Sequence, residues 1–187
     1  MKRLLFVAAL AACGGSTTER APVAAAPSAA PAPASASTGV INVTRAGFAG
    51  LSAETRPTQA DVKKALGNSF KVETDPVTKR VQASRADGVA LDVKPSASGN
   101  EIDTVRTTSD AVRFPWDARV GMSLGTHRHW EKMTCEAADA PGVAVCFADP
   151  KRAFRLEVEH DGPFPAKEDF ADKVVKALVW KPSGGPG

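Results

Sequence analysis

The chain has 187 residues, of which 24 are Lys or Arg and 21 are Asp or Glu, so its formal net charge is +3. It contains neither a block of like charges nor a basic stripe interleaved with aromatic residues, the two patterns that indicate nucleic-acid binding. We therefore expect no nucleic-acid partner.

The first thirteen residues have the pattern of a secretion signal. Lys2 and Arg3 precede an apolar run, and small residues lead up to Cys13. The run is far shorter than the ~20 apolar residues that cross a bilayer, so we do not expect a transmembrane helix. We predict a signal peptide over residues 1–12. Its removal leaves 22 basic residues against 21 acidic ones.

The end of this segment, Leu10-Ala11-Ala12-Cys13, resembles the lipobox of bacterial lipoproteins. In that family the cysteine thiol carries a diacylglycerol and becomes the first residue of the mature protein. The resemblance implies that Cys13 is the lipid attachment site and that acyl chains hold the protein on a membrane. Gly14 stands where an inner-membrane retention signal would have Asp. This implies the outer membrane, with the protein facing the periplasm. An ordinary signal peptide is the alternative.

A low-complexity segment follows the cysteine. Residues 14–38 are almost entirely Ala, Pro, Ser, Thr and Gly, which is too little bulky apolar surface to offset the entropy of ordering. We predict a disordered tether over residues 13–38 and a flexible tail over 182–187. Residues 39–181 then form a single α+β domain with a sizeable core.

The domain begins with an expected strand and helix. Residues 40–44, VINVT, alternate apolar and polar as a strand does. After a loop, Thr58 can cap a helix with Asp61 at its third position, and Gly67 ends it. We predict a helix of about nine residues between Thr58 and Gly67.

An antiparallel meander is predicted next. Asp87-Gly88 is a strong hairpin signal between two of its strands. The alternating runs that predict the strands are residues 70–74, 80–84, 89–93 and 102–107.

The second half repeats the order of helix then hairpin. Residues 125–133, GTHRHWEKM, favour a short helix, and residues 143–147 and 154–159 favour strands. We favour a terminal strand over 174–180, preceded by one or two helical turns from Lys167, and a final helix over residues 167–175 is the alternative. The expected fold class is α+β: mainly an antiparallel meander sheet with two or three short helices. Two helix–meander units are a further option.

Cys135 and Cys146 form an even pair once Cys13 is set aside. Ten residues separate them and contain the turn signal Ala-Pro-Gly. In an oxidising compartment this favours a structural disulfide. The alternative of a redox-active pair lacks the C-x-x-C spacing.

Most of the domain resembles the sigma-E-regulated lipoprotein family, small bacterial envelope lipoproteins of largely undefined function. The segments that carry the likeness are VINVT, GFAGLSAET, ADVKKAL, ARVGMSL, the cysteine pair and ALVW.

The helix also resembles a repeat of outer-membrane assembly lipoproteins and secreted β-lactamase inhibitors. In that repeat a helix with the pattern D-V-x-x-x-L-G precedes a small sheet, and residues 61–67 fit it. Gly121-Met122-Ser123 resembles the start of a second unit, although no second Leu-Gly follows at the right spacing. This resemblance implies an inhibitor or sensor of an envelope hydrolase.

Few residues form a pattern that could carry chemistry. On a strand, His127 and His129 would share a face and could bind zinc with His160 or Glu131, whereas on a helix they would point apart. The competing interpretation is two surface histidines beside a half-buried Trp130. Glu157 and Glu159 would share a strand face, as solvent-facing charges often do. We expect no catalytic residue, no bound metal and no cofactor.

The aromatic residues of the second half mostly fill a core. Arg113-Phe114-Pro115-Trp116 is the exception, because Pro between two rings favours an extended, partly exposed segment. We predict a binding edge formed by Arg113, Phe114 and Trp116, with core packing as the alternative.

These observations favour a non-enzymatic lipoprotein of the outer membrane, with a role in binding another envelope protein or in envelope maintenance. The first alternative is the hydrolase inhibitor or sensor, and a metal-dependent enzyme is more remote. Its expected partners are the membrane, through the lipid anchor, and another envelope protein.

Overall fold

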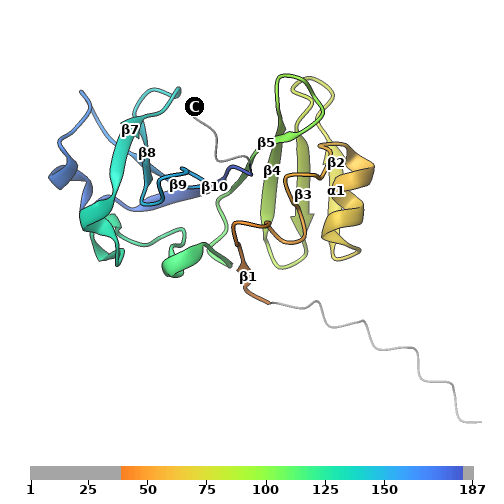
Figure 1. The fold of residues 1–187 in the computed structure, drawn as a ribbon, viewed down its shortest axis with the longest axis horizontal. Helices are drawn as coiled ribbons and strands as arrows, with labels where there is room; N and C mark the ends of the chain where they lie inside the picture. Colours follow the sequence, from red (N-terminus) through yellow and green to blue (C-terminus); the bar gives the residue numbers. More distant parts are fainter. Residues whose placement is uncertain (1–38, 183–187) are drawn as a thin grey trace, which may run out of the picture. The chain divides into compact units, whose positions relative to one another are not determined.

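The computed structural model describes residues 39–182, and its main element is an eight-stranded antiparallel sheet (Figure 1). The strands lie in the order β2-β3-β4-β5-β10-β9-β8-β7. Their bounds, in chain order, are β2 Phe70–Thr74, β3 Val81–Arg85, β4 Ala90–Pro95, β5 Ile102–Thr107, β7 Thr134–Ala137, β8 Val143–Phe147, β9 Phe154–Glu159 and β10 Val175–Trp180.

Several predictions fall beyond this range. The signal peptide, the lipid attachment residue Cys13 and the tether to residue 38 lie outside the described residues. Of the predicted tail, only Pro182 is described. Among residues 39–182, no helix is long and apolar enough to span a membrane.

The sheet consists of two four-stranded meanders, β2–β5 and β7–β10. Within each meander, strands that follow one another in the chain are antiparallel neighbours. The second meander enters the sheet in reverse order, so that the last strands of the two meanders, β5 and β10, pair with each other. The predicted meander of the first half is confirmed, with β3 and β4 each beginning one residue later than expected.

Helix α1, Gln59–Leu66, forms where the sequence predicts it. The Thr58 hydroxyl accepts a hydrogen bond from the backbone N–H of Asp61 and donates one to the Asp61 carboxylate, which caps the first turn. Gly67, with a φ of 77°, ends the helix. Val62 and Leu66 are buried on the face that packs toward the sheet.

The same helix covers the β2 edge of the sheet. The amide of Gln59 donates to the Val72 carbonyl at 2.9 Å, and the Lys63 ammonium donates to the Phe70 carbonyl. An edge strand otherwise presents unpaired backbone groups to other chains. The Gln59 and Lys63 side chains thus provide hydrogen-bond donors to carbonyls of β2, the strand at the edge of the sheet.

The helix content is lower than predicted. Among residues 39–182, α1 is the one α-helix. The prediction of a helix over residues 125–133 is wrong. Two 3-10 turns, Leu124–Thr126 and Trp130–Lys132, stand in its place. The backbone N–H of His129 donates to the His127 ring instead of to a carbonyl one turn earlier, so an α-helix cannot continue.

The remaining elements are short. The strand expected over residues 40–44 is reduced to β1, Ile41–Asn42, which pairs in parallel with β6, Val112–Arg113. A 3-10 turn over Lys167–Phe170 precedes β10, which agrees with the prediction of a helical turn followed by a terminal strand. A further 3-10 turn covers Pro115–Asp117.

The core lies across the joint between the two meanders. Trp180 on β10 is fully buried and stands opposite Val105 on β5 and Phe154 on β9. Its ring centroid lies 6.4 Å from that of Phe48. Phe48 belongs to the segment expected to be a loop, which folds back through paired backbone hydrogen bonds with Leu51. This segment therefore closes the core over the centre of the sheet.

Replacing Trp180 by Ala should lower the free energy of unfolding by about 3–5 kcal/mol, because a large ring would be removed from the centre of the core. Urea denaturation followed by circular dichroism measures this change. The control is Val77→Ala, since Val77 is 86% exposed and its loss should cost less than about 0.5 kcal/mol. Equal losses from the two variants would contradict this account of the core.

Candidate functional site

The cysteine pair ties an edge strand to the sheet. Cys135 on β7 and Cys146 on β8 are directly opposite in register, with Cα atoms 4.1 Å apart and sulfur atoms at disulfide distance. Such a short Cα separation is typical of a non-hydrogen-bonded antiparallel pair. Strand β7 is an edge strand and pairs with one neighbour, β8. The disulfide therefore links this edge strand covalently to the rest of the sheet.

The predicted binding edge is divided by the fold. Phe114 is only 3% exposed, and its ring packs against those of Phe48 and Phe154 at centroid distances of 6.3 and 5.3 Å. It is a core residue, so its assignment to a binding edge is wrong. Phe114, which precedes Pro115, is extended as expected, but a 3-10 turn follows over Pro115–Asp117, so the segment does not remain extended.

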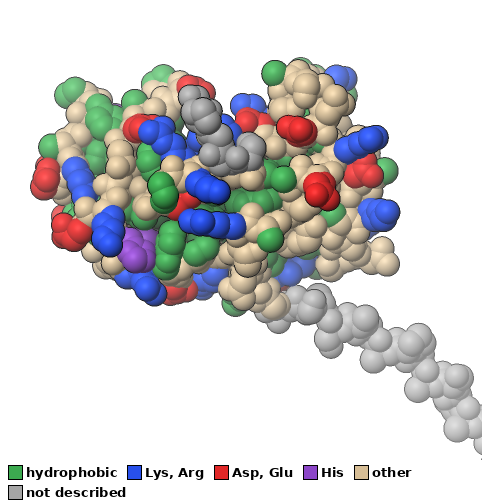
Figure 2. Space-filling view, in the orientation of Figure 1, with side chains coloured by type: hydrophobic (Ala, Val, Ile, Leu, Met, Phe, Trp, Pro, Cys, Tyr) green, Lys and Arg blue, Asp and Glu red, His purple; other side chains and the backbone are tan. Residues whose placement is uncertain are grey.

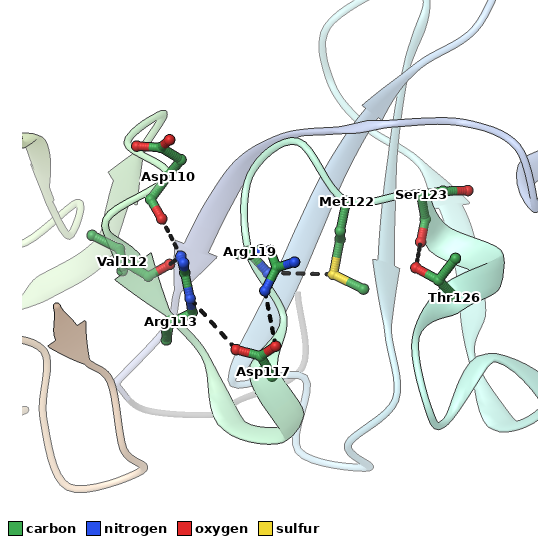
Figure 3. Close-up of polar contacts among 8 residues, drawn as sticks. All are labelled: Asp110, Val112, Arg113, Asp117, Arg119, Met122, Ser123 and Thr126. Carbon is green, nitrogen blue, oxygen red and sulfur yellow. Dashed lines mark hydrogen bonds and ion pairs between the residues drawn. The ribbon is translucent and has the colours of Figure 1, made fainter.

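Trp116 and Arg113 are half-exposed, but both already contact other side chains of the domain. Trp116 and Asp117 both have left-handed backbone conformations, with φ values of 65° and 61°, which are costly for residues other than Gly. Figure 3 shows the Asp117 carboxylate between the guanidinium groups of Arg113 and Arg119, at 3.4 and 3.0 Å. Arg113 also donates to backbone carbonyls. The Arg113 and Arg119 side chains therefore stabilise this strained turn through Asp117.

Trp116 packs against the two neighbouring histidines. Its ring lies 6.1 Å from that of His127 and 4.9 Å from that of His129, in edge-to-face arrangements. His127 is buried, and its Nδ1 accepts the His129 backbone N–H at 3.1 Å. Burial, together with the charges of His129 and Arg128, lowers the pKa of His127 below its ordinary value of 6.5.

This hydrogen bond argues against a metal at His127. A ring nitrogen that accepts a hydrogen bond is unprotonated, so the single proton of the neutral ring is on Nε2, which is then not free to bind a cation. His160 packs instead against Phe164 and Phe170. Within residues 39–182, no group of three His, Cys, Asp or Glu side chains is arranged to hold a metal ion.

The space behind Trp116 is too small for a substrate. A cavity of about 10 Å³ lies there, lined by apolar residues together with His127. A volume of that size accommodates about one water molecule. The region around Trp116 is therefore a packed corner of the domain.

A larger hollow, which sequence reasoning missed, crosses the opposite, polar face of the sheet. This groove has a volume of about 690 Å³, within the range of known ligand sites. Its charged lining residues come from both meanders and adjoining loops. They are Arg80, Asp92, Lys94, Asp103, Arg106, Glu136, Asp139, Arg152, Arg155, Glu157 and Lys181.

Most charges in the groove are paired within the protein. Arg80 contacts Asp92 at 2.6 Å, and Arg106 contacts Glu157 at 2.8 Å. Glu159, which was considered with Glu157 as a carboxylate pair, instead faces Lys176 at 3.7 Å. On the face shown in Figure 2, Lys and Arg side chains are interspersed with Asp and Glu. The groove itself is of mixed charge, because both arginine and carboxylate side chains line it.

The groove floor is apolar between its charged residues. Val179 on β10 stands directly between Arg106 on β5 and Arg155 on β9, and it is only 7% exposed. Phe147, 8% exposed, lies under the Arg152 guanidinium at 4.6 Å. Long arginine side chains can cover apolar surface while their charged ends stay in water. An apolar floor with a charged rim is the composition of many protein-binding surfaces.

Together, these features define a sheet-rich α+β domain with a polar groove across one face of its sheet. No family model and no curated protein matches the sequence. A similar fold is present in the crystal structure of the uncharacterized protein yfeY from Escherichia coli, with a TM-score of 0.51 and 13% sequence identity over 75% of this chain and 99% of that chain. At this identity, the similarity shows the fold alone.

Removing the disulfide by Cys135→Ser and Cys146→Ser should lower the free energy of unfolding by about 3 kcal/mol, the cost of releasing a loop of this length in the unfolded chain. Urea denaturation of both proteins measures the loss. Under reducing conditions the difference should largely disappear. If the two proteins differ as much with reductant as without, the loss comes from the serines and not from the cross-link.

Stability should also depend on the protonation of His127. Because its pKa is lower in the folded than in the unfolded state, the unfolded chain binds more protons just below pH 6.5. The free energy of unfolding should therefore fall as the pH decreases from about 7 to 5. His127→Asn keeps an acceptor but does not titrate, so this part of the pH dependence should vanish. The control, His160→Asn, should retain it.

Proposed function

We propose that this protein is a non-enzymatic lipoprotein of the outer membrane, anchored through Cys13 and facing the periplasm, whose domain binds another envelope protein. The groove across the polar face of the sheet is the observation that carries the binding part of the proposal. The role of the complex would be envelope maintenance or the response to envelope stress.

The anchoring part rests on the N-terminal sequence. Lys2 and Arg3, the apolar run and Leu10-Ala11-Ala12-Cys13 match the pattern of a lipoprotein signal. The pairing of Cys135 with Cys146 agrees with an oxidising compartment such as the periplasm. The low-complexity residues 14–38 would serve as a spacer between the membrane and the domain.

The arrangement of charges favours recognition over catalysis. Acid–base chemistry on a substrate requires titratable side chains directed at a common point. In the groove, Asp92, Asp103, Glu136 and Glu157 each contact a Lys or Arg side chain of the domain. Interspersed charges over an apolar floor instead suit a protein surface of complementary pattern, because they determine which partner binds and in which orientation.

The doubled meander supports a second candidate, an inhibitor or sensor of an envelope hydrolase. Residues 61–67 resemble the helix of β-lactamase inhibitor repeats, and each half of the chain adds a four-stranded meander to one sheet. However, only the first meander is preceded by an α-helix in the described residues. The two candidates share the same binding face and differ in the identity of the partner.

Wild-type protein should fractionate with the outer membrane, and Cys13→Ser should move to the soluble periplasmic fraction. To test binding in cells of the native host, a photoreactive amino acid replaces Gln82, an exposed residue of β3 that stands directly opposite the groove residue Asp92. In a separate variant it replaces Lys64, which is exposed on α1. Gln82 should give a discrete adduct and Lys64 should not.

Each part of the proposal can fail separately. Cys13→Ser protein that stays in the membrane would contradict lipid anchoring. An adduct from Lys64 alone, or from neither position, would contradict binding at the groove. If the partner in the Gln82 adduct is a hydrolase, its enzymatic activity is measured with and without this protein. A loss of activity on binding would favour the inhibitor candidate.

A further inference from the structure

Arg155 differs from the other arginines of the groove because it has no acidic partner within the described chain. Arg80, Arg106 and Arg152 each form an ion pair. Arg155 forms none with any carboxylate of residues 39–182, and its Nε donates to the Arg152 carbonyl at 3.1 Å. It is half-buried and lines the groove. Its terminal N–H groups are therefore suited to receive a carboxylate in the two-pronged geometry that arginine favours.

Asp92 provides the complementary group. Its Oδ2 contacts Arg80 at 2.6 Å, but its Oδ1 is buried and accepts no hydrogen bond from the residues that the structure describes. A buried acceptor without a donor is unfavourable. Arg106 stands directly opposite Asp92 in register, yet its guanidinium is directed to Glu157. Asp92 therefore adds a partly exposed negative charge to the lining of the groove, and only one of its two oxygens has a partner within the described chain.

These two groups lie in one row across the sheet. The register places Asp92 opposite Arg106, Arg106 opposite Val179, and Val179 opposite Arg155. Residues directly opposite on neighbouring strands share a face. Asp92 and Arg155 are three strand spacings apart, which is roughly 14 Å. Between them lie the apolar Val179 and the ion pair of Arg106 with Glu157.

We propose that the row from Asp92 to Arg155 is the contact strip for a protein partner that presents a carboxylate to Arg155 and a Lys ammonium to Asp92. This proposal rests on the proposed function, in which the groove binds an envelope protein, and it specifies the chemistry of the partner's surface.

The charges favour a protein over an anionic lipid surface. Phosphate groups could satisfy Arg155, but they would also face Asp92, Glu136 and Glu157 in the same groove. Like charges brought together at an interface are unfavourable. Only a surface that carries both signs, at a spacing of roughly 14 Å, matches both ends of the row.

The test uses the photoreactive residue at Gln82 in the full-length lipoprotein, in cells, with the adduct yield as the readout. Arg155→Glu should lower the yield at least about tenfold, because it places a carboxylate opposite the partner's carboxylate. Asp92→Asn should lower it several-fold. The matched control, Arg45→Glu, reverses an exposed charge that does not line the groove, so its yield should be unchanged.

Arg155→Lys distinguishes recognition from folding. It keeps the charge but not the two-pronged geometry, so it should recover part of the yield lost in Arg155→Glu. Thermal denaturation of each variant shows whether the domain is folded. If Arg155→Glu unfolds the protein, the comparison of Arg155→Lys and Arg155→Gln decides instead, and equal yields from these two would overturn the proposal.

The remaining outcomes separate this inference from the proposed function. A wild-type adduct that is unaffected by Arg155→Glu and Asp92→Asn would overturn the contact strip while leaving protein binding intact. If the protein without further substitutions gives no adduct at Gln82, both the contact strip and protein binding by the groove are overturned. The Cys13→Ser protein can also be sedimented with phosphatidylglycerol vesicles. If it binds them, if Arg155→Glu abolishes that binding, and if no protein adduct forms, the strip binds lipid and the proposal is overturned.

Discussion

The pairing of β5 with β10 is the contact on which the rest of the structure depends. Leu178 and Trp180 on β10 stand opposite Thr107 and Val105 on β5, and this register joins two meanders into one sheet. Without it, both strands would be open edges of their meanders, and open edges attract other chains. The same pairing places Trp180 in the core and Val179 in the groove, because successive residues of a strand point to opposite faces. Core and groove therefore share one strand.

The two ends of this sheet are protected by different means. At β2, α1 supplies Gln59 and Lys63 to carbonyls of the edge strand. At β7 a strand of four residues is cross-linked to its neighbour through Cys135 and Cys146. Both devices come from segments next to the edge strand in the chain. The ends are thus stabilised locally, while the centre depends on contacts between distant segments.

Sequence reasoning succeeded where structure is decided by neighbours in the chain. The cap at Thr58, the alternation along β2 to β5 and the terminal strand are local patterns, and each appears in the structure. It failed around Trp116 and His127. There, the His127 ring captures a backbone N–H that a helix would use, and Phe114 is drawn into the core by Phe48 and Phe154. Nothing in the local pattern indicates those partners.

By itself, the sequence determined the type and approximate bounds of most elements, the pairing expected of the two cysteines, and the outward positions of charged residues on the strands. Only the tertiary structure decided that Asp92, Arg106 and Arg155 fall in one row of one face. The physical reason is that alternation specifies the face of a residue within its strand. The order of strands depends instead on which apolar surfaces cover each other after distant segments have met.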